Sequence, residues 1–290
     1  GHPQPAPNPA RLAAEDTVMS ALPLLDLSAV HKRFGGLHAV NDVSFGVPAG
    51  SIKAVIGPNG AGKTTLFNLI AGNLPVSAGT IRFQGEDIQG RKPHQIARLG
   101  MARTFQNIKL FHGMTALECV MVGRHVQSRA GFFSGLLALP STWREERAIR
   151  ARSLELLDLL GIADCADIEA TSLAFGQQRA VEMARALAAE PKLLLLDEPA
   201  AGLNIYETAE VARLIRRIRD LGITVLLVEH DMSLVMDISD EIVVLSFGRT
   251  IAEDRPEAIQ QNAEVIRIYL GEDDEPAETG DAGQEAQAPC

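Results

Sequence analysis

Short apolar segments separated by turn-forming residues fill the first part of the chain, a pattern typical of β-strands. Three such segments lie at residues 24–30, 39–47 and 80–83, with Pro48 and Gly50 among the residues that break the pattern. We expect these three segments to form an antiparallel layer. A fourth segment, residues 52–56, is a short, mostly apolar run that favours a buried strand.

The next part of the chain has the longer hydrophobic period that is typical of helices. Residues 86–170 are mostly helical in pattern, and residues 145–160 predict a helix that ends at Gly161, with an apolar face made of Ile149, Leu154, Leu156, Leu157 and Leu160. Strands and helices then alternate, with strands expected at 193–196, 223–228 and 242–245 and helices at 207–220 and 232–238. This alternation predicts an α/β fold in which helices cover a parallel sheet. Phosphate sites in such sheets lie at the carboxyl ends of the strands.

Residues 57–64 match the phosphate-binding pattern G-x-x-x-x-G-K-[ST] and lie between the strand at 52–56 and a helix predicted at 65–70. Glycines let backbone N–H groups turn inward around phosphate oxygens, and the helix N-terminus adds a positive dipole end. Lys63 would place a full charge near the β- and γ-phosphates, and the Thr64 hydroxyl would bind Mg²⁺. A glycine-rich turn can also be purely structural, but the flanking strand and helix favour a phosphate site. The expected nucleotide-binding residues are Gly57, Asn59, Gly60, Ala61, Gly62, Lys63, Thr64 and Thr65.

Ionisable residues follow two of the later strands. Asp197 and Glu198 come directly after a run of four leucines, where Asp197 is placed to hold a Mg²⁺ shell through water and Glu198 to orient or deprotonate an attacking water. His230 follows the neighbouring strand. The alternatives are a solvated strand end for the acids and a helix cap for the histidine. The position of His230 after the acid pair favours the catalytic interpretation.

Composition describes a globular chain with acidic residues concentrated at one end. The formal charge of the 290 residues is −10, but residues 271–290 hold seven acids and no base, so the rest carries only −3. A nucleic-acid-binding surface is therefore not expected. The longest apolar candidate, residues 131–140, is far shorter than the roughly 20 residues that span a bilayer. The three cysteines, Cys119, Cys165 and Cys290, are far apart, which indicates a reducing compartment and no metal site.

A second anion-binding helix N-terminus is predicted at residues 172–179, before the acidic strand. At this point the chain resembles the ATP-binding subunits of ABC transporters. Six motifs occur in that family's order: the Walker A loop at 57–64, the Q-loop glutamine Gln106, the signature segment at 173–177, the Walker B strand at 193–198, the D-loop at 201–204 and the switch histidine His230.

The resemblance implies a P-loop cassette with a RecA-like parallel sheet, an antiparallel β layer and a helical subdomain at about 107–180. The cassette is expected to span residues 23–271, between a disordered N-terminal extension at 1–22 and an acidic disordered tail at 272–290. ATP and Mg²⁺ are the implied cofactors. The resemblance further implies that Phe34 stacks on adenine, that Gln106, Glu198 and His230 are catalytic, and that Mg²⁺ is bound by Thr64, Gln106 and Asp197.

One motif departs from the family pattern. The signature is usually Leu-Ser-Gly-Gly-Gln and covers the γ-phosphate of an opposing subunit, but here it reads Leu173, Ala174, Phe175, Gly176, Gln177. Losing one preorganised hydroxyl donor slows chemistry by roughly 10² to 10³ when nothing substitutes for it. The Gly176 N–H and the helix N-terminus remain, so we expect a working site with an altered donor set.

The altered signature segment resembles that of the ATPases of branched-chain amino acid importers. The same resemblance extends to residues 103–111, 197–204, 229–240 and 265–271 and to the extra segment at 124–147. Urea and short-amide importers are the near alternative. A soluble ABC ATPase that acts on DNA or ribosomes, or an ordinary P-loop kinase or GTPase, is a more distant one.

The resemblance implies a set of partners. They are two transmembrane permease subunits, a second ABC ATPase subunit and, indirectly, a solute-binding protein, with the chain located on the cytoplasmic face of a bacterial plasma membrane and no nucleic acid bound. We expect the permease to dock around residues 106–111, where Leu110 and Phe111 lie between Lys109 and His112. Packing of Phe111 in the core is the alternative.

Overall fold

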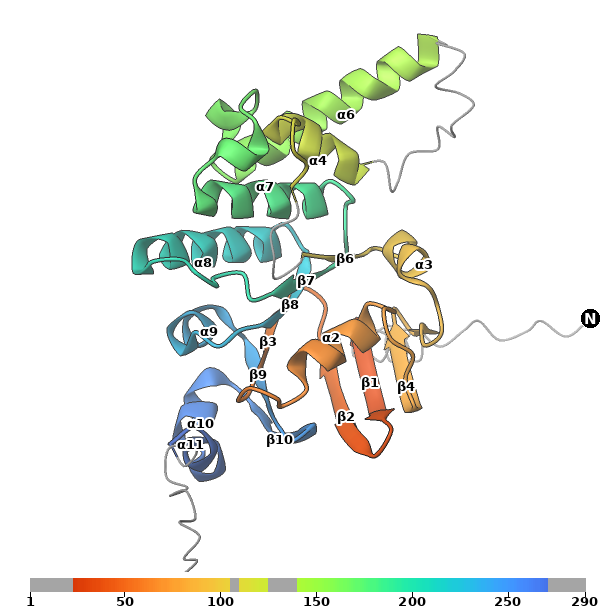
Figure 1. Ribbon diagram of the computed structural model, residues 1–290, viewed down its shortest axis with the longest axis vertical. Helices are drawn as coiled ribbons and strands as arrows, with labels where there is room; N and C mark the ends of the chain where they lie inside the picture. The colour runs from red at the N-terminus through yellow and green to blue at the C-terminus, as the bar shows by residue number, and fades with distance from the viewer. Residues whose placement is uncertain (1–22, 105–109, 125–139, 271–290) are drawn as a thin grey trace, which may run out of the picture.

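The computed structural model describes residues 23–104, 110–124 and 140–270, and it contains two sheets (Figure 1). One is four-stranded and antiparallel, in the order β2-β1-β4-β5. Its strands are β1 (Leu25–Phe34), β2 (Leu37–Val47), β4 (Ala78–Phe83) and β5 (Glu86–Asp87). The antiparallel layer expected from the first apolar segments is therefore present.

The second sheet has six strands in the order β10-β9-β3-β8-β7-β6. They are β3 (Ile52–Ile56), β6 (Met101–Arg103), β7 (Leu193–Asp197), β8 (Thr224–Val228), β9 (Glu241–Ser246) and β10 (Arg249–Asp254). All neighbours are parallel except β9 and β10. The carboxyl ends of β3, β7 and β8 therefore share one edge, which brings the phosphate loop beside the two strand ends that carry ionisable residues.

Two hydrophobic cores lie on opposite faces of this parallel sheet. Helix α2 (Lys63–Ile70) packs between the sheets, where it meets one face of the parallel strands through residues such as Val55 and Leu195. The alternate residues, such as Ala54 and Leu194, face the other core. Because side chains alternate along a strand, these mostly apolar strands are buried on both faces.

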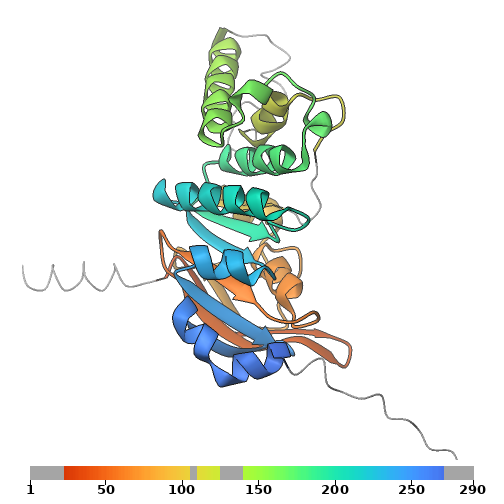
Figure 2. The same cartoon turned by 90° about the vertical axis from the view of Figure 1, so that its left-hand side faces the viewer.

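Helices cover the second face and extend beyond it. They are α8 (Ile205–Asp220), α9 (Met232–Ile238), α10 (Pro256–Gln261) and α11 (Ala263–Leu270). Both views place α4 (Ala116–Arg124), α6 (Pro140–Leu159) and α7 (Phe175–Leu187) together at one end of the molecule, with the antiparallel sheet toward the other (Figures 1 and 2). Short 3₁₀ turns at Ala163–Cys165 and Ala170–Ser172 connect α6 to α7.

Several sequence predictions need correction. Besides helices such as the short α3 (Pro93–Arg98), the region 86–170 contains the strands β5 and β6, and β10 was not predicted at all. Helix α6 begins earlier than expected, at Pro140. Within it, Leu154 is 36% exposed while Ser153 is buried. The face of the helix that packs on the core therefore includes Ser153 and not Leu154. The proposed disordered ends lie outside the described residues.

Candidate functional site

Close backbone approaches determine the shape of the phosphate loop between β3 and α2. A Cβ atom on Gly57 would lie 2.1 Å from the carbonyl oxygen of Leu245 in β9, and one on Gly62 would lie 2.3 Å from that of Ala39 in β2. Both glycines also have a positive φ. The loop is therefore pressed against β2 and β9, and no other residue type fits at these two positions.

The other residues of the predicted phosphate loop differ in their exposure to solvent. Asn59, Gly60 and Thr64 are exposed, Lys63 and Thr65 are half-buried, and Ala61 is buried. Gly62 caps α2, so the first backbone N–H groups of that helix lie directly after the loop. Free N–H groups at a helix N-terminus and an open loop make a suitable anion site.

Lys63 supplies the charge of this loop. Its Nζ donates to the carbonyl oxygens of Gly57 and of Pro58, the latter at 2.9 Å. Burial lowers the pKa of Lys63, and the nearby negative charge of Glu198 opposes that shift. Lys63 is thus bound to its own loop and lies within electrostatic reach of the acid at the end of β7.

The ends of β7 and β8 bring two of the three predicted catalytic residues, Glu198 and His230, together. Asp197 pairs with Val228 in the parallel register. Glu198 and His230, which come one and two residues after this pair, therefore lie at the same end of the sheet. Nδ1 of His230 lies 4.0 Å from Oε2 of Glu198. Glu198 has φ of 49°, a left-handed conformation that costs a non-glycine residue roughly 1–2 kcal/mol. Strain of this kind is typical of functional positions.

A buried carboxylate that sequence reasoning missed supports this arrangement. Glu229 is fully buried, and its Oε1 accepts from the N–H of Ala200 at 2.8 Å. Its Oε2 accepts from the N–H groups of His230 and Asp231 at 2.9 and 3.2 Å. Glu229 therefore ties the turn after Glu198 to the backbone that carries His230. An acid inside the motif at the end of β8 was the only signal in the sequence.

Arg103 is a second residue that sequence reasoning did not single out. Its guanidinium donates to Oδ2 of Asp197 and to Oδ1 of Asn68 in α2, both at 2.7 Å. Asp197, the predicted metal residue, is consequently buried in an ion pair rather than solvated. This finding contradicts the alternative of a solvated strand end for that acid.

The signature segment begins α7, as the sequence predicted. Ala174 caps the helix without a hydroxyl, and its N–H donates instead to Oε1 of Gln177 at 3.1 Å. Phe175 is exposed and Gly176 is half-buried. The ring of Phe175 lies next to Gly202, where an added Cβ would be 3.6 Å away, so the D-loop and the signature segment of one chain meet.

Phe34 and Gln106 are the two predicted residues that remain. Phe34 ends β1 and is 47% exposed, with Nζ of Lys32 5.0 Å from its ring centroid, so its ring is available at the surface. Gln106 lies outside the described residues, and its predicted role stays a prediction.

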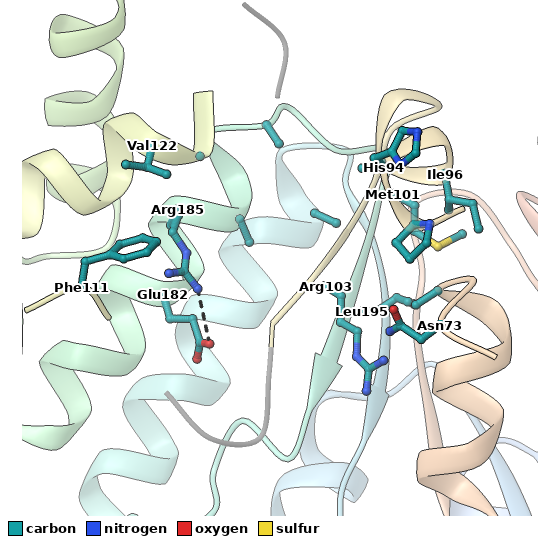
Figure 3. A pocket seen from close by; sticks show the side chains of 17 residues that line it. Asn73, His94, Ile96, Met101, Arg103, Phe111, Val122, Glu182, Arg185 and Leu195 are labelled. Carbon is teal, nitrogen blue, oxygen red and sulfur yellow. Dashed lines mark ion pairs between the residues drawn. The ribbon is translucent and has the colours of Figure 1, made fainter. Parts of the chain in front are cut away.

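A cleft of about 560 Å³ separates α3 and β6 from α4 and α7 (Figure 3). Phe111 lines it and is 45% exposed, which excludes the alternative that Phe111 packs in the core. The guanidinium of Arg185 lies 5.9 Å from the ring centroid of Phe111 and also approaches Glu182, with 3.8 Å between Nη2 and Oε1. Arg103 lines the facing wall, so the cleft reaches from Phe111 to the partner of Asp197.

The site contains hard oxygen donors that could bind a metal ion. The Thr64 hydroxyl and the Asp197 carboxylate suit Mg²⁺, which prefers oxygen ligands and retains several waters. Among the described residues, no group of three or more His, Cys, Asp and Glu side chains forms a metal cluster. Within the same residues, no helix combines the length and the apolar character needed to cross a membrane.

Comparison with known proteins agrees with this geometry. The family model described as "ABC transporter" matches residues 40–201, and that of the "branched-chain amino acid ATP-binding cassette transporter" matches residues 249–275. The chain is similar to the high-affinity branched-chain amino acid transport ATP-binding proteins BraF of Pseudomonas aeruginosa and LivG of Escherichia coli strain K12, at 46% and 45% identity. Each alignment covers 86% of this chain and 98% of the relative.

A solved structure matches the whole cassette. The ADP conformation of MJ1267, an ATP-binding cassette of an ABC transporter, superimposes with a TM-score of 0.76 at 30% sequence identity. The match covers 87% of this chain and 100% of that one. The α/β cassette fold expected from the sequence is thereby confirmed.

Proposed function

Because this chain belongs to the ABC transporter ATP-binding family, we propose that it is the ATP-hydrolysing, energy-coupling subunit of an importer for branched-chain amino acids. The observation that carries the proposal is the shared edge of β3, β7 and β8. There the phosphate loop meets Asp197, Glu198 and His230 in a chain similar to importer ATPases over nearly their whole length.

Each residue of the site has a defined task in this proposal. The loop N–H groups and Lys63 bind the β- and γ-phosphates, while Phe34 offers its exposed ring to adenine. Glu198 accepts a proton from the attacking water, and His230 stabilises the orientation of that water and of the γ-phosphate. Thr64, Asp197 and Gln106 would hold Mg²⁺, which supplies neutralising charge at the phosphates when bound.

The γ-phosphate also needs donors from another cassette. We assign that contact to Ala174, Phe175, Gly176 and Gln177 of an opposing subunit, since Phe175 and Ala174 are exposed at the start of α7. Without a serine hydroxyl, the donors are the backbone N–H groups of that helix N-terminus. We favour a second, similar ATPase subunit as the opposing chain.

The cleft beside Phe111 is our candidate for the permease contact. It is mostly apolar, and its open side exposes Phe111, which suits the apolar face of a short helix. One of the two permease subunits, bound here, would hold the chain against the inner face of the plasma membrane. A solute-binding protein would act on the permeases and would not touch this chain.

Reconstitution tests the proposal directly. The chain, a candidate second ATPase, two candidate permeases and a solute-binding protein are placed in liposomes, and leucine uptake and phosphate release are measured. We expect ATPase activity above the sum of the separate components, and uptake of leucine rather than urea.

The outcomes separate the alternatives. Uptake of urea in place of leucine would move the chain to the near alternative, and stimulation by nucleic acid but not by permeases would overturn a transport role. Full transport with this ATPase alone would replace the heterodimer by a homodimer.

A further inference from the structure

Arg103 connects the permease cleft with the site proposed for Mg²⁺. It is the last residue of the edge strand β6 and pairs in register with Leu195, two residues before Asp197 on β7. Its side chain lines the cleft on the wall opposite Phe111 (Figure 3). One side chain thus reaches both the surface proposed for the permease and the acid proposed for the metal.

The guanidinium bridges two separate elements. One nitrogen donates to Oδ2 of Asp197 and the other to Oδ1 of Asn68, which lies on α2, the helix that starts at the phosphate loop. The carbon of the guanidinium lies 5.9 Å from the ring centroid of Phe67 on the same helix. Arginine suits this task because its planar fork reaches two acceptors at once, which a lysine ammonium does less well.

The ion pair is also buried. The side chains of Arg103 and Asp197 are 11% and 6% exposed, so their interaction is screened less than a surface pair. A buried carboxylate needs compensating donors or charges, and here Arg103 supplies a positive charge. A divalent cation near Asp197 must therefore compete with a charge that is already in place.

We propose that Arg103 is a positioning residue that links occupancy of the cleft to the metal site. It neutralises Asp197 and joins β7 to α2, and a partner that presses on the cleft wall shifts the guanidinium and thereby releases Asp197 toward Mg²⁺. This inference rests on the proposed function for the identity of the partner. It assigns Arg103 and Asn68 a task that differs from substrate contact.

The competition between the Arg103 charge and Mg²⁺ is tested on the chain without any permease. Binding of a fluorescent ATP analogue is measured against Mg²⁺ concentration for wild type, Arg103→Gln and Arg103→Lys. Because glutamine removes the competing charge and retains an N–H donor for Asp197, the half-saturating Mg²⁺ concentration should fall by about tenfold. Lysine keeps the charge, so its value should stay within about twofold of wild type.

The bridge is tested in liposomes with the permeases. Arg103→Lys and Asn68→Ala both break the link between β7 and α2, so the ratio of permease-stimulated to basal ATPase activity should fall at least about threefold in each. Arg82→Gln is the matched control, because Arg82 makes an exposed pair with Asp87 on the antiparallel sheet. It should leave both the ratio and the Mg²⁺ dependence unchanged. Thermal unfolding in EDTA verifies that each variant is folded.

The proposal has a metal half, the competition of Arg103 with Mg²⁺ for Asp197, and a coupling half, the bridge between β7 and α2. Different results would overturn each half. An Arg103→Gln variant with the wild-type Mg²⁺ dependence overturns the competition for Asp197. Full stimulation in Arg103→Lys and in Asn68→Ala overturns the bridge. A wild-type chain that no permease stimulates overturns the proposed function and the coupling half, whereas the Mg²⁺ titration still judges the metal half by itself.

Discussion

Replacing Glu229 by glutamine should damage the site although Glu229 makes no contact with substrate in our proposal. Its carboxylate accepts three backbone N–H groups, from Ala200, His230 and Asp231, and is fully buried. An amide has a single acceptor oxygen, and its NH₂ group would face an N–H donor. At least one buried N–H therefore loses its acceptor.

The magnitude follows from these contacts. A hydrogen bond to a charged group contributes about 1.5–3 kcal/mol, and a buried unpaired donor costs about 1–3 kcal/mol. We expect a destabilisation of about 3 kcal/mol, which lowers Tm by about 6–12 °C in a domain of this size. Because the backbone of His230 and the turn after Glu198 both lose support, kcat should fall by about 10- to 100-fold. Nucleotide affinity should change little, since β2 and β9 hold the phosphate loop.

Thermal unfolding, nucleotide titration and phosphate release measure these three effects on one preparation. Glu210→Gln is the matched control, because Glu210 makes an exposed pair with Arg213 on α8 and such pairs contribute about 0.5 kcal/mol or less. A Glu229→Gln variant with Tm within about 2 °C of wild type and kcat within about twofold would refute the reasoning.

Four further outcomes are expected. Glu198→Gln should bind ATP, trap a closed dimer and nearly lose turnover, since an amide holds water without accepting its proton; normal turnover would place the base elsewhere. Lys63→Ala should weaken ATP binding in a direct titration, because it removes the charge of the phosphate loop, and an unchanged affinity would contradict that role. Deleting residues 272–290 should change the ATPase rate by less than about twofold at fixed salt; a larger loss would make the acidic tail regulatory. Phe111→Asp should abolish permease stimulation and keep Tm and basal ATPase activity, because the ring is 45% exposed; a lowered Tm would show that the ring supports the fold.

Local patterns carried most of the fold and part of the site. The mostly apolar runs located β3, β7, β8 and β9 to within one residue at each end, because a strand buried on both faces is built mainly from apolar residues. The glycines of the phosphate loop were readable because Gly57 and Gly62 occupy positions that only glycine tolerates. Strands β6 and β10 were missed because they are edge strands: β6 has only three residues, and β10 is largely polar and has no buried residue.

The partner of each polar group was decided by the tertiary structure. Arg103 and Asp197 are 94 positions apart, and Ala200 and Glu229 are 29 apart, yet each pair meets because β6, β7 and β8 are neighbours in the sheet. The sequence determined where strands, helices and the phosphate loop form, because backbone conformation and burial depend on local residue order. Strand order is set by packing across the whole chain, and it alone placed Arg103 on Asp197 and Glu229 beside Ala200.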